Sequence, residues 1–197
     1  MMRQEVEIEF KNMLTKDEFL RMKQAFHIDD DAFSYQENHY FDTPTFSLKE
    51  KGAALRIRMK QHTYTLTLKQ TIEEGLLETH EPLTTEEAEM LLKGASAFPS
   101  EMAALLQSLG VVSNTIRYFG TLATYRAELP YEGGLLVLDH SLYLQTEDYE
   151  IEYEATDRVR GKAIFEQLLT TMNIPIRPTK NKIKRFYAKK YEAEEQR

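Results

Sequence analysis

Near its start the sequence contains a stretch, EVEIEFK at residues 5–11, in which charged and apolar side chains alternate. A period of two indicates a β-strand, because successive side chains of a strand point to opposite faces of a sheet. Glu5, Glu7, Glu9 and Lys11 therefore share one face, and the apolar residues between them share the other. Such a strand can fold only where its apolar face is covered and its charged face meets water or counter-ions.

The same alternation returns in AALRIRMK (53–60), TYTLTLKQ (63–70) and YEIEYEA (149–155). The charges separate by sign, because the early and late strands carry carboxylates whereas the middle strands carry cations. The late carboxylates are Glu150, Glu152 and Glu154, and the cations of the middle strands are Arg56, Arg58, Lys69 and Arg126. One structural explanation must therefore serve several strands at once.

The rest of the chain predicts an α+β fold with about eight strands, mostly joined as hairpins, in an antiparallel sheet or barrel flanked by helices. Thr15 with Glu18, and Thr84 with Glu87, have the spacing of a capping box and predict two helix starts. The strands are expected at about 3–12, 35–44, 53–60, 63–70, 76–83, 115–129, 134–139, 142–145 and 148–155. Further helices are expected from Ser100 to Gly110, over 157–172 and in the charged tail, about 181–195.

Length and composition favour an ordinary globular protein, with a single domain over residues 1–197. The formal net charge of −7 argues against general nucleic-acid binding through electrostatics. No apolar run approaches the roughly 20 residues that span a bilayer, and the N-terminus lacks the apolar core of a secretion signal. The sequence has no cysteine, which excludes disulfides and thiolate metal sites and fits a cytoplasmic protein.

Two interpretations of the charged faces remain open. In the first, they are simply the solvated side of an antiparallel sheet. In the second, they line the interior of a barrel of about eight strands, which is wide enough for one small ligand. Clustered carboxylates would then bind Mg²⁺ or Mn²⁺, and Arg and Lys would surround phosphate oxygens. A metal-bound polyphosphate would satisfy both groups of charges.

The second interpretation gains weight from a resemblance. EIEFK (7–11) matches the ExExK signature of the CYTH superfamily, the triphosphate tunnel metalloenzymes. Other segments match in family order along nearly the whole chain: YFDTP (40–44), LRIR (55–58), LTLK (66–69), YR (125–126), LD (138–139), EIE (150–152) and Lys180 in RPTKNK. ExExK alone is a weak pattern, but the ordered set is specific. The resemblance implies an eight-stranded antiparallel β-tunnel flanked by helices.

The resemblance also implies roles for individual residues. The expected metal ligands are Glu7, Glu9, Glu81, Asp139, Glu150 and Glu152, with Mg²⁺ or Mn²⁺ as the metal. For Asp139 the resemblance leaves two roles open, holding the metal or positioning a basic side chain. Phosphate binding is expected from Lys11, Arg56, Arg58, Lys69, Arg126, Lys180 and Lys182. Lys69 and Tyr40 resemble a pair that activates the attacking water in thiamine triphosphatases. Glu78 is an alternative to Glu81 as the metal ligand of its strand. Glu5 and Glu154 extend the acidic rows of the first and the late strand.

The implied function is a metal-dependent hydrolase of a small triphosphate, such as tripolyphosphate, thiamine triphosphate or a nucleoside triphosphate. Two alternatives use the same tunnel. An adenylate cyclase of class IV type would cyclise ATP, and a non-catalytic protein would only bind polyphosphate or nucleotide. The sequence does not name the organic group on the phosphates, the preferred metal or the oligomeric state.

Overall fold

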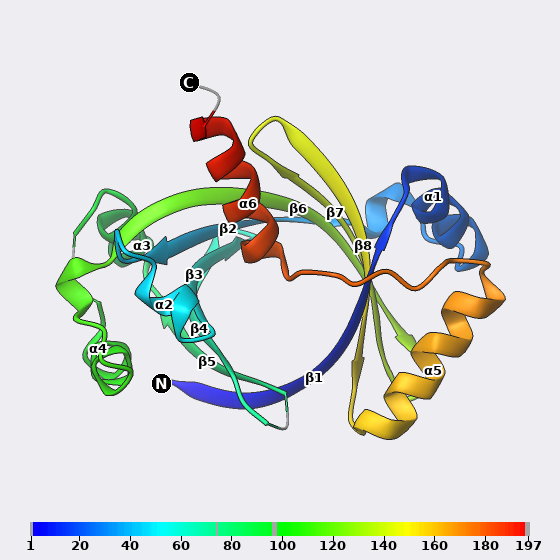
Figure 1. Ribbon diagram of the computed structural model, residues 1–197, viewed down its shortest axis with the longest axis horizontal. Helices are drawn as coiled ribbons and strands as arrows, with labels where there is room; N and C mark the ends of the chain where they lie inside the picture. The colour runs from blue at the N-terminus through cyan, green and yellow to red at the C-terminus, as the bar shows by residue number, and fades with distance from the viewer. Residues whose placement is uncertain (1, 74, 96–97, 196–197) are drawn as a thin grey trace. The chain divides into compact units, whose positions relative to one another are not determined.

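The computed structural model describes residues 2–73, 75–95 and 98–195. Its strands are β1 (Arg3–Leu14), β2 (Ser34–Asp42), β3 (Ala53–Lys60), β4 (Thr63–Thr71), β5 (Leu76–Leu83), β6 (Arg117–Tyr131), β7 (Gly134–Tyr143) and β8 (Thr146–Ala155). They close into an antiparallel barrel in the order β1-β5-β4-β3-β2-β6-β7-β8 (Figure 1). This confirms the predicted fold class.

The helices are α1 (Lys16–Ala25), α2 (Ser47–Glu50), α3 (Thr85–Leu92), α4 (Ser100–Ser108), α5 (Arg158–Thr171) and α6 (Lys182–Glu195), with short 3₁₀ turns at Asp30–Ala32 and Ser113–Thr115. Both predicted capping boxes are present, with Thr15 and Thr84 as the N-caps. At α1, the Thr15 hydroxyl accepts the Glu18 N–H at 3.2 Å, and the Glu18 carboxylate accepts the Thr15 N–H at 2.8 Å.

The prediction of two short strands at 134–139 and 142–145 is wrong, because β7 runs unbroken over Gly134–Tyr143. His140 and Ser141 fall between the two predicted strands. In the structure they continue the alternation, since Ser141 lies fully buried opposite Asp148 and His140 lies opposite Tyr149 on the other face. Polar residues can therefore extend a strand whose charged face is also buried.

The chain divides into two compact units. The first comprises Met1–Val6 and Gln36–Leu122, and the second comprises Glu7–Tyr35 and Ala123–Arg197. Each unit has its own apolar core. The single domain predicted over 1–197 stays a prediction.

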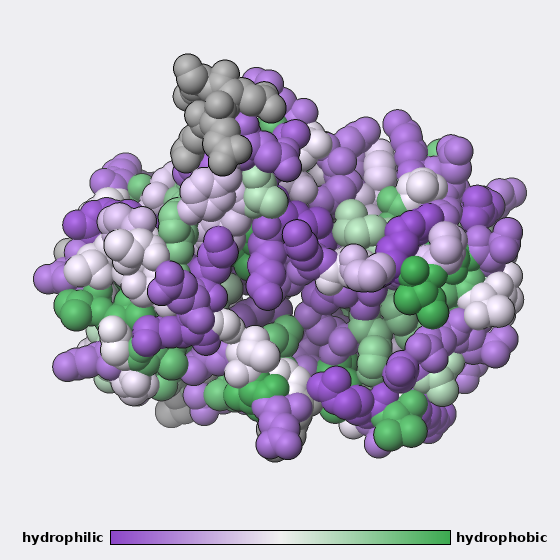
Figure 2. Space-filling model, in the orientation of Figure 1, coloured by the Kyte–Doolittle hydropathy of each residue, from purple (hydrophilic) through white to green (hydrophobic). Residues whose placement is uncertain are grey.

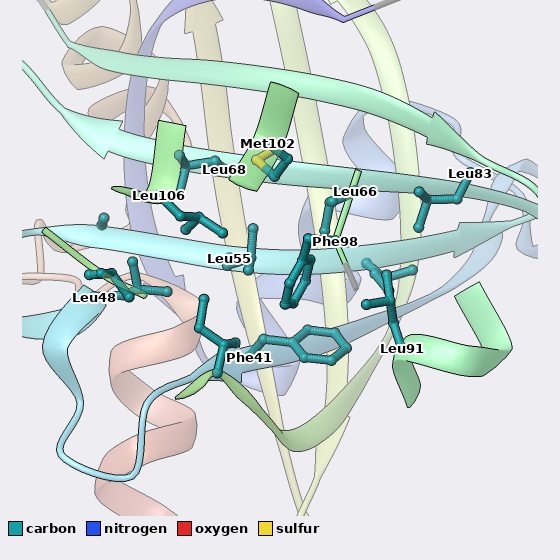
Figure 3. Packing of buried hydrophobic residues seen from close by; sticks show 14 of the residues in the cluster. Phe41, Leu48, Leu55, Leu66, Leu68, Leu83, Leu91, Phe98, Met102 and Leu106 are labelled. Carbon is teal, nitrogen blue, oxygen red and sulfur yellow. The ribbon is translucent and has the colours of Figure 1, made fainter. Parts of the chain in front are cut away.

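In the first unit, the apolar side chains of neighbouring strands lie opposite one another. Leu55 faces Leu68 and Ile57 faces Leu66 across β3 and β4, and all four are fully buried. Met102 and other residues of the helices complete this cluster (Figure 3). The alternation predicted from the sequence is confirmed here: one face of these strands is the core, and the cations occupy the other.

In the second unit, α1 and α5 both contact β8 (Figure 1). Phe19 from α1 and Phe165 from α5 join Leu138 and Ile151 of the strands in one buried cluster. The charged residues of β7 and β8 alternate with these apolar ones and so lie on the opposite face. The side of the surface drawn in Figure 2 is mainly hydrophilic, with hydrophobic residues in separate spots.

Gly161 lets α5 approach the sheet closely. A Cβ at this position would lie 2.4 Å from the Ala155 Cβ and 2.9 Å from the Phe10 ring. We expect Gly161→Ala to destabilise the protein by about 1–3 kcal/mol, because overpacking outweighs the gain of about 1 kcal/mol in helix propensity. Urea unfolding would measure this, with Gln167→Ala on the exposed side of α5 as the control. A stability equal to or above that of the wild type would contradict the close contact.

Among the described residues, no helix combines the length and the apolar character needed to cross a membrane.

Candidate functional site

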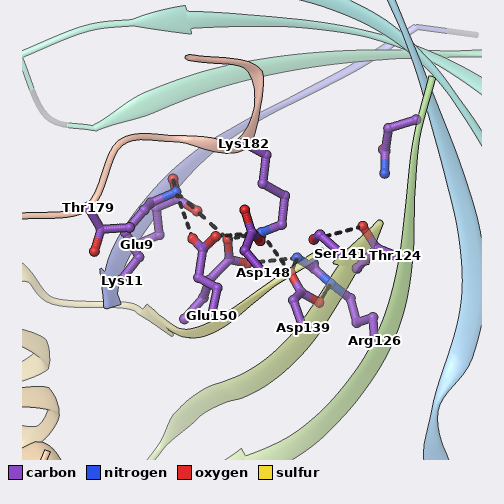
Figure 4. A network of polar contacts seen from close by, with 12 residues as sticks. Glu9, Lys11, Thr124, Arg126, Asp139, Ser141, Asp148, Glu150, Thr179 and Lys182 are labelled. Atoms are coloured by element: carbon purple, nitrogen blue, oxygen red, sulfur yellow. Dashed lines mark hydrogen bonds and ion pairs between the residues drawn. The ribbon is translucent and has the colours of Figure 1, made fainter. Parts of the chain in front are cut away.

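The charged face of the second unit is built by four neighbouring strands. The register places Lys11 of β1 opposite Glu152 of β8, and Glu150 of β8 opposite Asp139 of β7. Asp139 in turn lies opposite Arg126 of β6. Since directly opposed residues of antiparallel strands point to the same face, their side chains meet, as Figure 4 shows.

Asp139 is fully buried and binds two cations. Arg126 donates from Nε to Oδ1 at 2.8 Å and from Nη2 to Oδ2 at 2.6 Å, a bidentate pair. The Lys182 ammonium lies 2.7 Å from Oδ2. A carboxylate without water needs such partners, because an isolated buried charge is very unfavourable.

Glu152 and Glu150 continue this network along β8. Glu152 accepts Arg126 Nη2 at 2.7 Å and Lys182 Nζ at 2.7 Å. Glu150 lies 3.2 Å from Lys182 Nζ and also binds Arg185, yet its Oε1 atom is buried without a hydrogen-bond partner. This Oε1 atom lies 4.0 Å from the Lys11 ammonium, a cation at ion-pair distance.

Lys11 links β1 to the same carboxylates. Its ammonium lies 2.6 Å from Glu9 Oε1 and 3.8 Å from Glu152 Oε1. Glu7, two residues before Glu9, shares a hydrogen bond with the carboxyl group of Glu154. Two carboxyl groups in contact need a proton or a cation between them.

Helix α6 contributes two of the cations. Lys182 is its first residue, and Arg185 donates from Nε to Asp148 Oδ2 at 2.9 Å. Lys180 is exposed, and its backbone carbonyl accepts a hydrogen bond from Arg185. Of the two lysines expected to bind phosphate here, the structure brings Lys182 into the network but not Lys180. Arg185 and Asp148 were absent from the predicted site.

The burial of these groups sets their pKa values in different directions. Burial alone would raise the pKa of Glu152, but Lys182, Arg126 and Lys11 hold it well below its usual range. The pKa of Asp139 is also lowered, because the attraction of Arg126 and Lys182 outweighs the effect of burial. For Glu150, burial outweighs the attraction of Lys182, and its pKa is raised.

These directions predict how the free energy of unfolding depends on pH. Asp139 and Glu152 have a lower pKa in the folded protein than in the unfolded chain, where carboxyls titrate near about 4. Their stabilisation is therefore complete above about pH 5 and is lost as the pH falls through the folded values. Glu150 has the opposite sign, because its raised pKa means that charging it opposes folding.

We therefore expect Glu152→Gln to destabilise the protein by about 3 kcal/mol or more at pH 7. Glu150→Gln should cost clearly less, since it removes a charge that folding disfavours. Urea unfolding of both variants at pH 7 and pH 4 would measure this, and the difference should shrink at the lower pH. A Glu150→Gln variant as unstable as Glu152→Gln at pH 7 would contradict the assigned pKa directions.

The first unit carries a second charged face, on β2 to β5. The register aligns Tyr40, Arg56, Thr67 and His80 across four strands. Beside them, Arg58 donates from Nε to the Asn38 amide oxygen at 3.3 Å. The Nε group of Arg56 is buried without a hydrogen-bond partner. This face therefore has an N–H group that could donate a hydrogen bond to an anion.

Glu78 is the carboxylate at the centre of this face. It forms an ion pair with Lys69, which lies opposite it on β4, and lies 3.9 Å from Arg56 Nη2. The His80 Nε2 atom lies 3.4 Å from Glu78 and 3.1 Å from Glu5. Burial lowers the pKa of His80 against the attraction of Glu78 and Glu5, which disfavours the charged form of the ring.

Glu81, the expected metal ligand on this strand, lies elsewhere. It is opposite Leu66, on the face that carries the apolar core, and burial and the neighbouring Glu101 raise its pKa. The structure does not bring Glu81 to Lys69 and Arg56. The alternation of the strand could have predicted this difference. Glu78 and Glu81 are three residues apart and cannot share a face of a regular strand.

Comparisons with known proteins agree with the predicted family. Residues 5–187 match the family described as the CYTH domain. A Bacillus subtilis strain 168 protein named "Putative triphosphatase YjbK" is 52% identical over 189 residues, covering 96% of this chain and 98% of its own length.

Two solved structures are also similar. One, from Bacillus halodurans, is described as a "putative adenylate cyclase"; it is 44% identical, has a TM-score of 0.90 and covers 93% of this chain and 98% of its own. The other, from Hippeastrum, is described as "Putative adenylyl cyclase HpAC1" with a dominant triphosphatase activity. It is 25% identical, has a TM-score of 0.73 and covers 92% of this chain and 95% of its own. Because the CYTH domain matches residues 5–187, nearly the whole chain, this protein belongs to the CYTH family.

Proposed function

We propose that the protein is a divalent-metal-dependent hydrolase that releases phosphate from a small triphosphate. The observation that carries the proposal is the buried network in which Asp139, Glu150 and Glu152 alternate with Lys11, Arg126 and Lys182. Such a set supplies carboxylates for a metal and cations for phosphate oxygens in one place. The activity named for YjbK and for the Hippeastrum protein supports the same reaction.

The cations are proposed to hold the phosphates. Arg126, Lys11 and Lys182 belong to the network of the second unit, with Lys180 as the exposed neighbour. Arg56, Arg58 and Lys69 of the first unit have the same role by resemblance. The unpartnered Nε of Arg56 supports it, because an arginine binds phosphate through parallel N–H groups and here one of them is unused.

The carboxylates are proposed to hold Mg²⁺ or Mn²⁺. The donor set fits, because Glu7, Glu9, Asp139, Glu150 and Glu152 offer only oxygen, which these hard cations prefer. The contact between the carboxyl groups of Glu7 and Glu154 also favours a cation there. Glu81, on the apolar face, is a weaker candidate than Glu78.

Within the described residues, no three carboxylate or histidine side chains already stand in a metal-binding group. This fits the way Mg²⁺ commonly binds at phosphate sites, through one or two carboxylates completed by water and substrate oxygens. When bound, the metal would neutralise phosphate charge and polarise the reacting phosphorus.

The remaining step is the attack of water on the terminal phosphorus, which breaks the bond from that phosphorus to the bridging oxygen and releases orthophosphate, with the shortened phosphate chain as the leaving group. Lys69 and Tyr40 are proposed to orient that water, and Glu78 holds the Lys69 ammonium on the charged face. Tyr40 is buried on the same face, opposite Arg56. Positioning and charge neutralisation carry most of the catalysis in phosphoryl transfer, so these residues act without a covalent intermediate.

A second function, adenylate cyclase, is favoured by the description of the Bacillus halodurans structure. A ribose hydroxyl would then replace water as the nucleophile and attack the α-phosphorus. A third, binding without turnover, would use the same cations and carboxylates.

One experiment separates the three functions. The protein is incubated with tripolyphosphate, thiamine triphosphate, ATP and GTP, each with Mg²⁺ or Mn²⁺, and released phosphate and cyclic AMP are both measured. We expect phosphate from at least one substrate and no cyclic AMP. Cyclic AMP as the main product from ATP would favour the cyclase, and tight binding without any product would favour a binding protein.

A further inference from the structure

A second candidate site lies in the second unit, on the face opposite the charged network. Tyr125, His140 and Tyr149 stand directly opposite one another on β6, β7 and β8. The His140 and Tyr149 rings are stacked, with centroids 4.6 Å apart and planes at 12°. Tyr125 extends the row, with its centroid 6.1 Å from that of His140 at 27°. The three rings form an aromatic floor.

Helix α1 forms a wall beside this floor. Lys16, Phe19, Leu20 and Lys23 follow the i, i+3, i+4, i+7 spacing of one helix face, and all four line the cavity. Phe33 also contributes. The cavity measures about 420 Å³, within the range of about 300–1,000 Å³ for small-molecule sites. We call it the aromatic pocket.

The aromatic pocket has apolar groups at its opening. The Leu20 side chain is 49% exposed and Tyr125 is 40% exposed, although both are large hydrophobic residues. Exposed apolar groups around a concave site are typical of a place where a ligand binds. The proposed hydrolase uses none of these residues, because Tyr125, His140 and Tyr149 alternate along their strands with Arg126, Asp139 and Glu150.

The charges around the pocket indicate the sign of the ligand. Glu147 contacts His140 Nε2 at 2.7 Å, and Asp30 forms an ion pair with Lys23. Lys16 differs, since it forms no hydrogen bond or ion pair with any residue in the described part of the chain. Its recorded interaction is a longer-range attraction that helps to lower the pKa of Glu147. The Lys16 ammonium therefore contacts no acceptor among the described residues and can donate to an acidic group at its end of the pocket.

We propose that the aromatic pocket binds a small planar aromatic anion. Its ring would stack on the exposed Tyr125 side of the floor, and its acidic group would pair with Lys16. An aromatic stack strengthens binding up to about tenfold beyond the effect of the area it buries, and an exposed ion pair strengthens it by about threefold. The proposal is independent of the hydrolase activity, so either can fail alone.

The test uses 2-naphthoate as the anionic probe and 2-naphthylmethylammonium as its cationic counterpart. Isothermal titration calorimetry of the full chain should show binding of the anion at one site and at least about threefold weaker binding of the cation. An excess of tripolyphosphate with Mg²⁺ should not displace the anion, which separates this site from the charged network.

Two variants locate the probe. Tyr125→Ala should weaken naphthoate binding up to about tenfold, and Lys16→Gln should weaken it about threefold while leaving neutral 2-naphthalenemethanol unchanged. Lys162→Gln, a lysine change on the exposed side of α5, is the matched control and should have no effect. Circular dichroism would check that each variant is folded. A further variant at an exposed position, Leu20→Glu, places a carboxylate at the opening and should weaken naphthoate binding by repulsion.

Three results would overturn the proposal: no binding of naphthoate, equal binding of the cationic probe, or binding that neither Lys16→Gln nor Leu20→Glu weakens.

Discussion

Replacing Glu9 with glutamine is expected to lower phosphate release from the triphosphate substrate at least about a hundredfold. Glu9 is a proposed metal ligand, and substitution of groups that only support a metal ligand already costs about 10–100-fold. Glutamine keeps the size of the side chain but removes the charge that would bind the cation and that now attracts Lys11. Steady-state phosphate release at saturating Mg²⁺ or Mn²⁺ would measure the loss.

The matched control for this prediction is Glu5→Gln. Glu5 belongs to the same charged row of β1, but it is 46% exposed and contacts Arg3 and His80 instead of the buried network. We expect nearly wild-type activity from it. Thermal unfolding should show both variants folded, and full activity of Glu9→Gln would remove Glu9 from the site.

Asp139→Asn is expected to give the largest loss of stability, about 3–5 kcal/mol. Breaking a buried ion pair by removing one partner leaves the other charge without compensation. Here two cations would be affected, because Arg126 and Lys182 both bind the fully buried carboxylate. An asparagine could still accept one hydrogen bond, but it cannot neutralise either charge.

Urea unfolding at pH 7 would measure this loss, with the exposed Asp31→Asn as the control. The control should stay within about 0.5 kcal/mol of the wild type, as surface substitutions usually do. A loss below about 1 kcal/mol for Asp139→Asn would mean that water reaches Arg126 and Lys182 and replaces the carboxylate.

The fold was largely predictable because its signals are local. Alternation of charged and apolar residues located the strands, and the Thr15 and Thr84 capping boxes located two helix starts. The error at β7 has a physical cause. The polar residues His140 and Ser141 continue the alternation of β7, because Ser141 lies on its charged face, which is also buried.

The site was less predictable, because its partners are far apart in the sequence. Lys180 and Lys182 look equivalent in RPTKNK, yet only Lys182 reaches Asp139, since α6 begins at that residue. Arg185 pairs with Asp148 through the docking of the same helix, which no local pattern specifies. The place of Glu78 on the charged face could have been predicted from the sequence, because strand alternation puts Glu78 and Glu81 on opposite faces.

The most direct test of the account follows tripolyphosphate by ³¹P nuclear magnetic resonance in the presence of the wild-type protein. With Mg²⁺ or Mn²⁺, we predict that its signals are replaced by those of pyrophosphate and orthophosphate, and that a chelator or Glu9→Gln stops the change. If tripolyphosphate stays intact and the thiamine and nucleoside triphosphates do too, or if turnover is equally fast without divalent metal, the proposed hydrolase is contradicted.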